Sequence, residues 1–140
     1  MNPGRAFAAG VIGAVVMSLI MNGFRATGTP IHLELRLAAT AGTHIWVVGF
    51  VLYLLVGGVL ALGYAAVFEY VLNQAGIGPG LLIGAYHTIL AGFFWASVTG
   101  PGPFWDSFGP EGIGLLFLLH LTYGATVGAL YRMEHVLAYV

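Results

Sequence analysis

The sequence predicts an all-helical membrane protein, a single domain over residues 1–140 that forms a bundle of four transmembrane helices. The first observation is composition: 59% of the 140 residues are hydrophobic and 6% are charged, whereas a soluble domain is about one quarter charged. The second is that the four basic and five acidic residues leave long uncharged stretches, and a membrane-spanning helix needs about 20 apolar residues. This composition excludes a soluble enzyme, a nucleic-acid-binding protein and a disordered region. The absence of cysteine excludes disulfides and thiolate metal sites.

The first expected helix covers residues 6–24. A signal peptide would have a shorter apolar region followed by a clean small-residue cleavage site, so we expect this helix to remain in the mature protein. Residues 29–42 follow, opening with Thr-Pro, which is typical of a helix N-cap with proline at the first helical position. Residues 31–37 alternate between apolar and polar side chains, as the residues of a strand do, but a lone strand at a membrane surface has no partner. We therefore expect a short interfacial helix here.

Three further helices are expected, over residues 45–68, 80–97 and 112–131. Four spans place both termini on one side of the membrane, with the loop 69–79, and we place that side in the cytoplasm of a bacterial cell. On the other side, the Gly-Pro-rich residues 99–106 predict a rigid, non-helical connection. Aromatic residues gather near both expected boundaries, as interfacial belts do: Trp46, Trp95 and Trp105 on the second side, and Tyr64, Tyr70, Tyr131 and Tyr139 on the first.

Small residues recur at every fourth position of the expected helices, which predicts close packing. Helices in lipid associate through van der Waals contact, and small side chains let their backbones approach. The ladder of the first helix matches that of the third, and the second matches the fourth, so we expect two hairpins in a parallel repeat with units of about residues 1–70 and 75–140. Two of the ladders contain GxxxG. The expected packing residues are Gly10, Ala14, Ser18, Gly57, Ala61, Gly80, Gly84, Thr88, Gly92, Gly124 and Gly128.

Two segments of the chain also carry a resemblance. The opening run Gly10-Val-Ile-Gly13, with Met17 and Met21, and the closing run from His120 to Tyr131 resemble small bacterial membrane proteins of uncharacterised families. Their hairpins have similar Gly-rich helices, often ending in a His-x-x-Tyr-Gly pattern. The likeness spans most of the chain. It implies four helices and supplies no activity, cofactor or catalytic residue.

Two histidines, His87 and His120, fall inside expected helices, and an ionisable residue within a span is a functional candidate. A neutral imidazole can ligate haem, a metal or a chlorophyll-type pigment. It can equally donate to a backbone carbonyl or a threonine in a helix interface. At a rise of 1.5 Å per residue the two histidines would differ in depth by about 8 Å, which strains a shared haem.

Other residues are candidates for contact with a partner. Glu34, Arg36, Trp105 and Asp106 lie on the second side, where we expect solvated boundary residues or a docking site for a neighbouring subunit. No ligand-type residues stand at a recognised metal spacing, so no metal site is expected. Met17 and Met21 lie four apart, a pair that can bind Cu(I), although flexible packing is the commoner use of methionine.

These observations support three functional hypotheses. The sequence favours a small integral-membrane subunit or interaction protein without catalytic residues or a cofactor, in contact with other membrane subunits or with copies of itself. The second hypothesis is a redox or light-related protein that binds haem, a metal or a pigment through His87 and His120. The third is a small oligomeric transporter or channel, with which parallel repeats are compatible, although no intramembrane charge marks a substrate path.

Overall fold

The protein is described by a computed structural model that covers residues 1–29, 32–99 and 104–137. Over these ranges the structure is helical and contains no strand, as the sequence predicts. The elements in chain order are α1 (Pro3–Ala26), α2 (Leu33–Thr40), α3 (Trp46–Val67), the π-helical turn η1 (Phe68–Leu72), α4 (Ile77–Thr99) and α5 (Phe104–Leu137).

Three stretches of the described helices are long and apolar enough to cross a membrane, namely Pro3–Ala26, Trp46–Leu72 and Gly112–Tyr131. A fourth apolar stretch, Ile77–Gly92 in α4, is shorter. Length and composition are therefore those of an integral membrane protein, and the expected fourth span stays a prediction.

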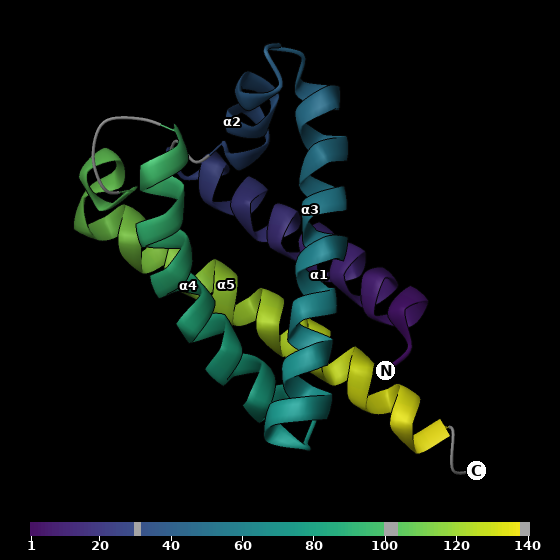
Figure 1. The fold of residues 1–140 in the computed structure, drawn as a ribbon. Helices are drawn as coiled ribbons and strands as arrows, with labels where there is room; N and C mark the ends of the chain where they lie inside the picture. The colour runs from purple at the N-terminus through teal and green to yellow at the C-terminus, as the bar shows by residue number, and fades with distance from the viewer. Residues whose placement is uncertain (30–31, 100–103, 138–140) are drawn as a thin grey trace.

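The long helices pack as two pairs, α1 with α3 and α4 with α5, which are joined by the contact of α1 with α5. Helix α1 packs against α3 and α5, α4 packs along α5, and the short α2 packs on α3. Helices α3 and α4 meet at η1 and diverge towards their other ends (Figure 1).

Three expected boundaries are wrong. The interfacial helix begins at Leu33 with His32 as its cap, later than Thr29. The second long helix continues through η1 and stops at Asn73, whose φ of 48° is left-handed, so residues 69–72 are not loop. Residues 104–106 are not part of a non-helical connection, since they form the start of α5.

Small residues lie at the contacts between the long helices. A side chain at Gly10 would collide with the carbonyl oxygen of Gly57 on α3, and one at Gly80 with that of Gly124 on α5. Gly84 and Gly128 face the carbonyl oxygens of His120 and Gly76 in the same way. The other expected packing residues are also buried, namely Ala14, Ser18, Ala61, Thr88 and Gly92.

Large aromatic rings fill the space that these small residues leave. Tyr64 and Tyr131 are 4% and 2% exposed, and Phe68 stacks on Tyr131 with ring centroids 6.0 Å apart. The prediction that Tyr64 and Tyr131 form an interfacial belt is therefore wrong, since both rings belong to the core. Tyr70 is exposed, as a residue of the belt would be.

Candidate functional site

A cavity of about 470 Å³ that is open on one side is lined by residues from all five α-helices. Small-molecule sites have volumes of about 300–1,000 Å³ and walls that are mostly apolar. Aliphatic side chains form most of this wall. The polar or charged lining residues are Arg36, Tyr53, His87, His120 and Tyr123.

The cavity opens sideways between α3 and α4. Three of its lining residues are exposed apolar side chains, Val56 and Leu60 on α3 and Leu90 on α4, at 39%, 38% and 50%. They lie on the two helices that diverge from η1 (Figure 1). The open side of the cavity is therefore apolar.

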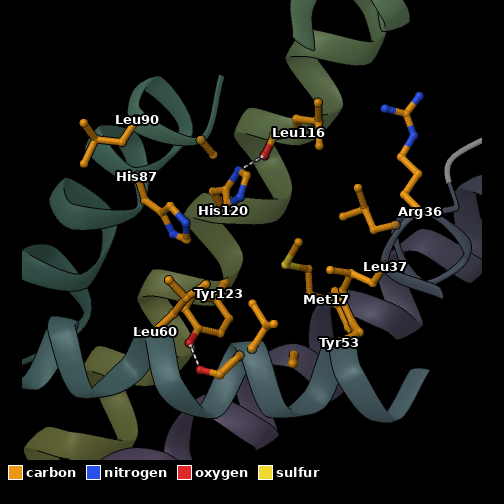
Figure 2. Close-up of a pocket in the computed structure, with 15 residues that line it drawn as sticks. Met17, Arg36, Leu37, Tyr53, Leu60, His87, Leu90, Leu116, His120 and Tyr123 are labelled. Atoms are coloured by element: carbon orange, nitrogen blue, oxygen red, sulfur yellow. Dashed lines mark hydrogen bonds between the residues drawn. The ribbon is translucent and has the colours of Figure 1, made fainter. Parts of the chain in front are cut away.

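His87 and His120 lie side by side in the cavity wall, with ring centroids 4.5 Å apart and planes inclined by 52° (Figure 2). The separation of about 8 Å expected from their depths is wrong because the register of α4 against α5 differs from the expected one. Gly80 faces Gly124, and Gly84 faces the backbone of His120. His87 is therefore less than one turn from the level of His120.

The tautomer of His120 follows from its hydrogen bond. Its Nδ1 lies 2.9 Å from the carbonyl oxygen of Leu116, and because a carbonyl only accepts, Nδ1 carries the hydrogen and donates. In the neutral ring Nε2 then carries the lone pair. One expected role of His120, donation to a backbone carbonyl, is thus present, although the carbonyl belongs to its own helix. Within the described part of the chain, the structure gives Nε2 no hydrogen-bond partner.

His87 is held by a tyrosine. Its Nδ1 lies 2.9 Å from the hydroxyl oxygen of Tyr64, and either group can be the donor. The Tyr64 ring also meets the His87 ring edge-on at a centroid distance of 5.8 Å. His87 is thereby fixed in orientation while both of its tautomers stay accessible.

Two further tyrosines lie at the cavity, on α5 and α3. The Tyr123 hydroxyl donates to the carbonyl oxygen of Gly57, which joins α5 to α3 (Figure 2). Tyr53 is 7% exposed, and its hydroxyl is one of two buried side-chain atoms without a hydrogen-bond partner among the described residues. Buried polar groups normally have a partner, so this hydroxyl marks a place for a water molecule or a ligand group.

The other unpartnered atom is Oε2 of Glu34, a residue that is 1% exposed. Its Oε1 accepts from the guanidinium of Arg25 and from the indole Nε1 of Trp46, the latter at 3.1 Å. Burial alone would raise the pKa of Glu34, but the hydrogen bonds from its own backbone N–H, Arg25 and Trp46 outweigh it and lower the pKa. The expected solvated position of Glu34 is therefore wrong, since α2 folds back onto α3 and turns this side chain inwards.

Arg36 lies two residues after Glu34 on α2. It lines the cavity, and burial lowers its pKa. The expected roles of the Trp105 and Asp106 side chains lie outside the described residues. Met17 lines the cavity and Met21 is fully buried in the core. Among the described residues no three His, Asp or Glu side chains are grouped as a metal site.

Sequence reasoning identified both histidines but not the three tyrosines, Tyr53, Tyr64 and Tyr123. A signal was present for Tyr53 and Tyr123, since each lies well inside an apolar span, where a hydroxyl must find an internal partner. Comparisons of the chain with protein-family models, with curated proteins and with solved structures find no match.

Proposed function

We propose that this chain is a small integral-membrane protein of four spans that binds a lipophilic small molecule at the His87–His120 pair. The ligand enters from the bilayer through the opening between α3 and α4. The observation that carries this proposal is the pair of adjacent imidazoles in the wall of an apolar cavity of about 470 Å³.

The size of the cavity argues for a ligand. Its volume of about 470 Å³ is within the range of small-molecule sites, and its wall is mostly apolar, as such sites are. A purely structural subunit would have no use for the cavity, and this hypothesis ranks second.

The polar groups in the cavity wall also support a bound ligand. The Tyr53 hydroxyl is buried without a hydrogen-bond partner among the described residues, and an unsatisfied buried polar group costs about 1–3 kcal/mol. A ligand group that meets this hydroxyl would remove part of this cost. On the neighbouring wall, the hydrogen bond of the His120 ring is made by Nδ1, so a ligand group that donates would bind the lone pair on Nε2.

Two observations support four spans arranged as a repeat. Helix α4 has 23 residues, which at 1.5 Å per residue is about 35 Å and enough for a bilayer core. Gly10 packs against Gly57 in one helix pair and Gly84 approaches Gly124 in the other, and these are the positions that correspond in the proposed repeat.

The test is to fill the cavity without touching the histidines. Ala91→Phe places a ring in the cavity wall on α4, and Leu82→Phe places the same ring on an exposed site of α4, 63% exposed, as a matched control. The probe is an alkylated naphthol, whose hydroxyl can donate to an imidazole, titrated by fluorescence into protein in lipid nanodiscs. We expect Ala91→Phe to weaken binding at least about tenfold, a loss of about 1.4 kcal/mol, and the control to leave it unchanged. Equal binding by both variants and the wild type would contradict the proposal.

A further inference from the structure

We infer that the cavity has a second polar subsite, in which a hydroxyl group of the ligand bridges Tyr53 on α3 and Glu34 on α2. This inference rests on the proposed function and narrows its ligand to an apolar molecule with a hydroxyl group at the end away from the histidines. Two observations carry it: both residues have a buried oxygen without a hydrogen-bond partner among the described residues, and helix packing brings the two residues together at the cavity.

Helix α2 crosses α3 at Gly49. A side chain at Gly49 would collide with the backbone carbonyl of Glu34, so the start of α2 lies directly on this turn of α3. Trp46 and Tyr53 stand three residues before and four residues after Gly49, and residues at these spacings share one face of a helix. The Trp46 indole donates to Oε1 of Glu34 at 3.1 Å, and the Tyr53 hydroxyl is close enough to interact electrostatically with the same carboxylate. The Glu34 carboxylate therefore lies along the face of α3 that carries Tyr53.

One oxygen of each residue remains to be satisfied. Oε1 of Glu34 accepts from Arg25 and Trp46, whereas its Oε2 has no partner in the described part of the chain. The same holds for the Tyr53 hydroxyl, so these two groups are not bonded to each other. Both residues are buried, and buried polar groups normally have a partner. A small polar group placed between them would satisfy both.

A neutral hydroxyl has the chemistry that this pair of atoms needs. Glu34 is paired with Arg25 as a carboxylate, and a carboxylate only accepts, whereas a phenol can also donate. A single alcohol or phenol oxygen can donate to Oε2 of Glu34 and accept from Tyr53 at once. A carbonyl or an ether has no hydrogen to donate, and an ammonium group would bring a charge past the apolar wall of the cavity, which is costly.

The position of this subsite favours a ligand hydroxyl over a lone water molecule. Tyr53 is part of the cavity wall, and Glu34 is flanked along α2 by two lining residues, Leu33 and Leu37. Tyr53 and His87 lie on different sides of the cavity (Figure 2). A hydroxyl between Tyr53 and Glu34 would thus leave the apolar part of the molecule in the cavity, and a second polar group could reach the imidazoles.

The first experiment varies the ligand. Alkylated naphthols whose chain ends in a hydroxyl, a methyl ether or an ammonium group are titrated by fluorescence into the full chain in lipid nanodiscs, over a series of chain lengths. Protein-free nanodiscs correct for partition into lipid. At the best-fitting length we expect the hydroxyl probe to bind at least about fivefold more tightly than the other two, because the ether loses the hydrogen bond to the Glu34 carboxylate.

The second experiment varies the protein. Tyr53→Phe and its matched control Tyr123→Phe each remove a hydroxyl from the cavity wall, but that of Tyr123 is already bonded to the Gly57 carbonyl. The measured quantity is the affinity of the hydroxyl probe relative to the alkylated naphthol with a plain chain. Tyr53→Phe should lower this ratio about two- to tenfold, the loss of one hydrogen bond, and Tyr123→Phe should leave it at the wild-type value.

The outcomes separate this inference from the proposed function. Equal binding of the hydroxyl and ether probes, tighter binding of the ammonium probe, or a ratio that Tyr53→Phe leaves unchanged overturns the hydroxyl subsite. If the plain alkylated naphthol still binds in these cases and Ala91→Phe still weakens it, the proposed function stands. Binding of none of the probes contradicts both.

Discussion

Polar side chains in this bundle are satisfied largely by the backbone of their own helix. Thr88 donates to the carbonyl of Gly84 at 3.1 Å, and His120 to that of Leu116 at 2.9 Å. Each is an i to i−4 contact, which a residue can make in lipid without any partner helix. Tyr53 has no such bond among the described residues, and that makes its hydroxyl informative about what the cavity holds.

Removing the Tyr53 hydroxyl should therefore not cost stability. In Tyr53→Phe the ligand-free protein should unfold at the same free energy as the wild type or about 1 kcal/mol higher, because the hydroxyl is buried without a partner. The same change at Tyr123 breaks the bond to Gly57 and should lower the free energy of unfolding by about 1 kcal/mol. Reversible unfolding in mixed micelles measures both, and equal losses for the two variants would count against an empty site at Tyr53.

The buried carboxylate of Glu34 is expected to make the stability of the fold depend on pH in the acid range. Its pKa is lowered in the folded protein, so its contribution to stability is complete above the pKa of an unfolded glutamate, about 4.3, and is lost as the pH falls through the lower folded value. Glu34→Gln should cost about 1.5–3 kcal/mol at pH 7, the range for hydrogen bonds to a charged group, and this deficit should shrink below pH 4.

The measurement for Glu34 is the free energy of unfolding of both proteins from pH 7 down to the acid transition. Trp46→Phe, which removes only one of the two side-chain hydrogen bonds to Glu34, serves as a milder comparison and should lose about 1 kcal/mol. A deficit of Glu34→Gln that is constant over this range would show that the carboxylate charge does not stabilise the α1–α2 junction.

At the scale of the helices, glycine contacts set the register of α4 against α5. A side chain at Gly124 would collide with the carbonyl of Gly80, whereas nothing lies within 4 Å of a side chain at Gly114 on the same helix. The register in turn brings the two histidines to nearly the same level, which is why their rings meet.

Gly124→Ala should therefore destabilise the fold by about 1–3 kcal/mol, as overpacking does, and should also weaken binding of the alkylated naphthol by moving His87 away from His120. Gly114→Ala should be neutral or stabilising by up to about 1 kcal/mol, because alanine is the better helix former. Both are measured by unfolding and by titration. Equal stability of the two variants would contradict the proposed register.

The ends of the helices show what the sequence does and does not predict at this scale. Uncharged stretches predicted long helices at the right places, since hydropathy depends only on residue type. The continuation of the second helix to Leu72 and the start of α5 at Phe104 depend on local backbone choices that hydropathy does not report. The register of α4 against α5 likewise depends on which glycines meet, and the ladders allow several alignments.

At the scale of the whole molecule, the scarcity of charge predicted an all-helical, membrane-type protein, and the described helices agree. The cavity could not be predicted, because its wall combines side chains of all five α-helices, and which of them meet depends on how the helices pack. The histidines were identifiable because ionisable residues in a span are rare, but their contact was not.

The four-span topology is testable because the chain has no cysteine. Single cysteines replacing Asn2 and Val140 should both react with a membrane-impermeant maleimide from one side of oriented vesicles, and Ala41→Cys, between α2 and α3, from the other. If α4 does not span, the two terminal cysteines should react from opposite sides. Labelling of the termini on opposite sides would leave only three spans.

The most direct test of the central claim is a native mass spectrum of the protein ejected from its own membranes, without added ligand. We expect the mass of the chain plus one small-molecule adduct, absent from Ala91→Phe and retained in Leu82→Phe. Two results would contradict the claim that this cavity holds a ligand. One is the bare mass of the chain in the wild type as well as in Ala91→Phe, and the other is an adduct that is retained in Ala91→Phe.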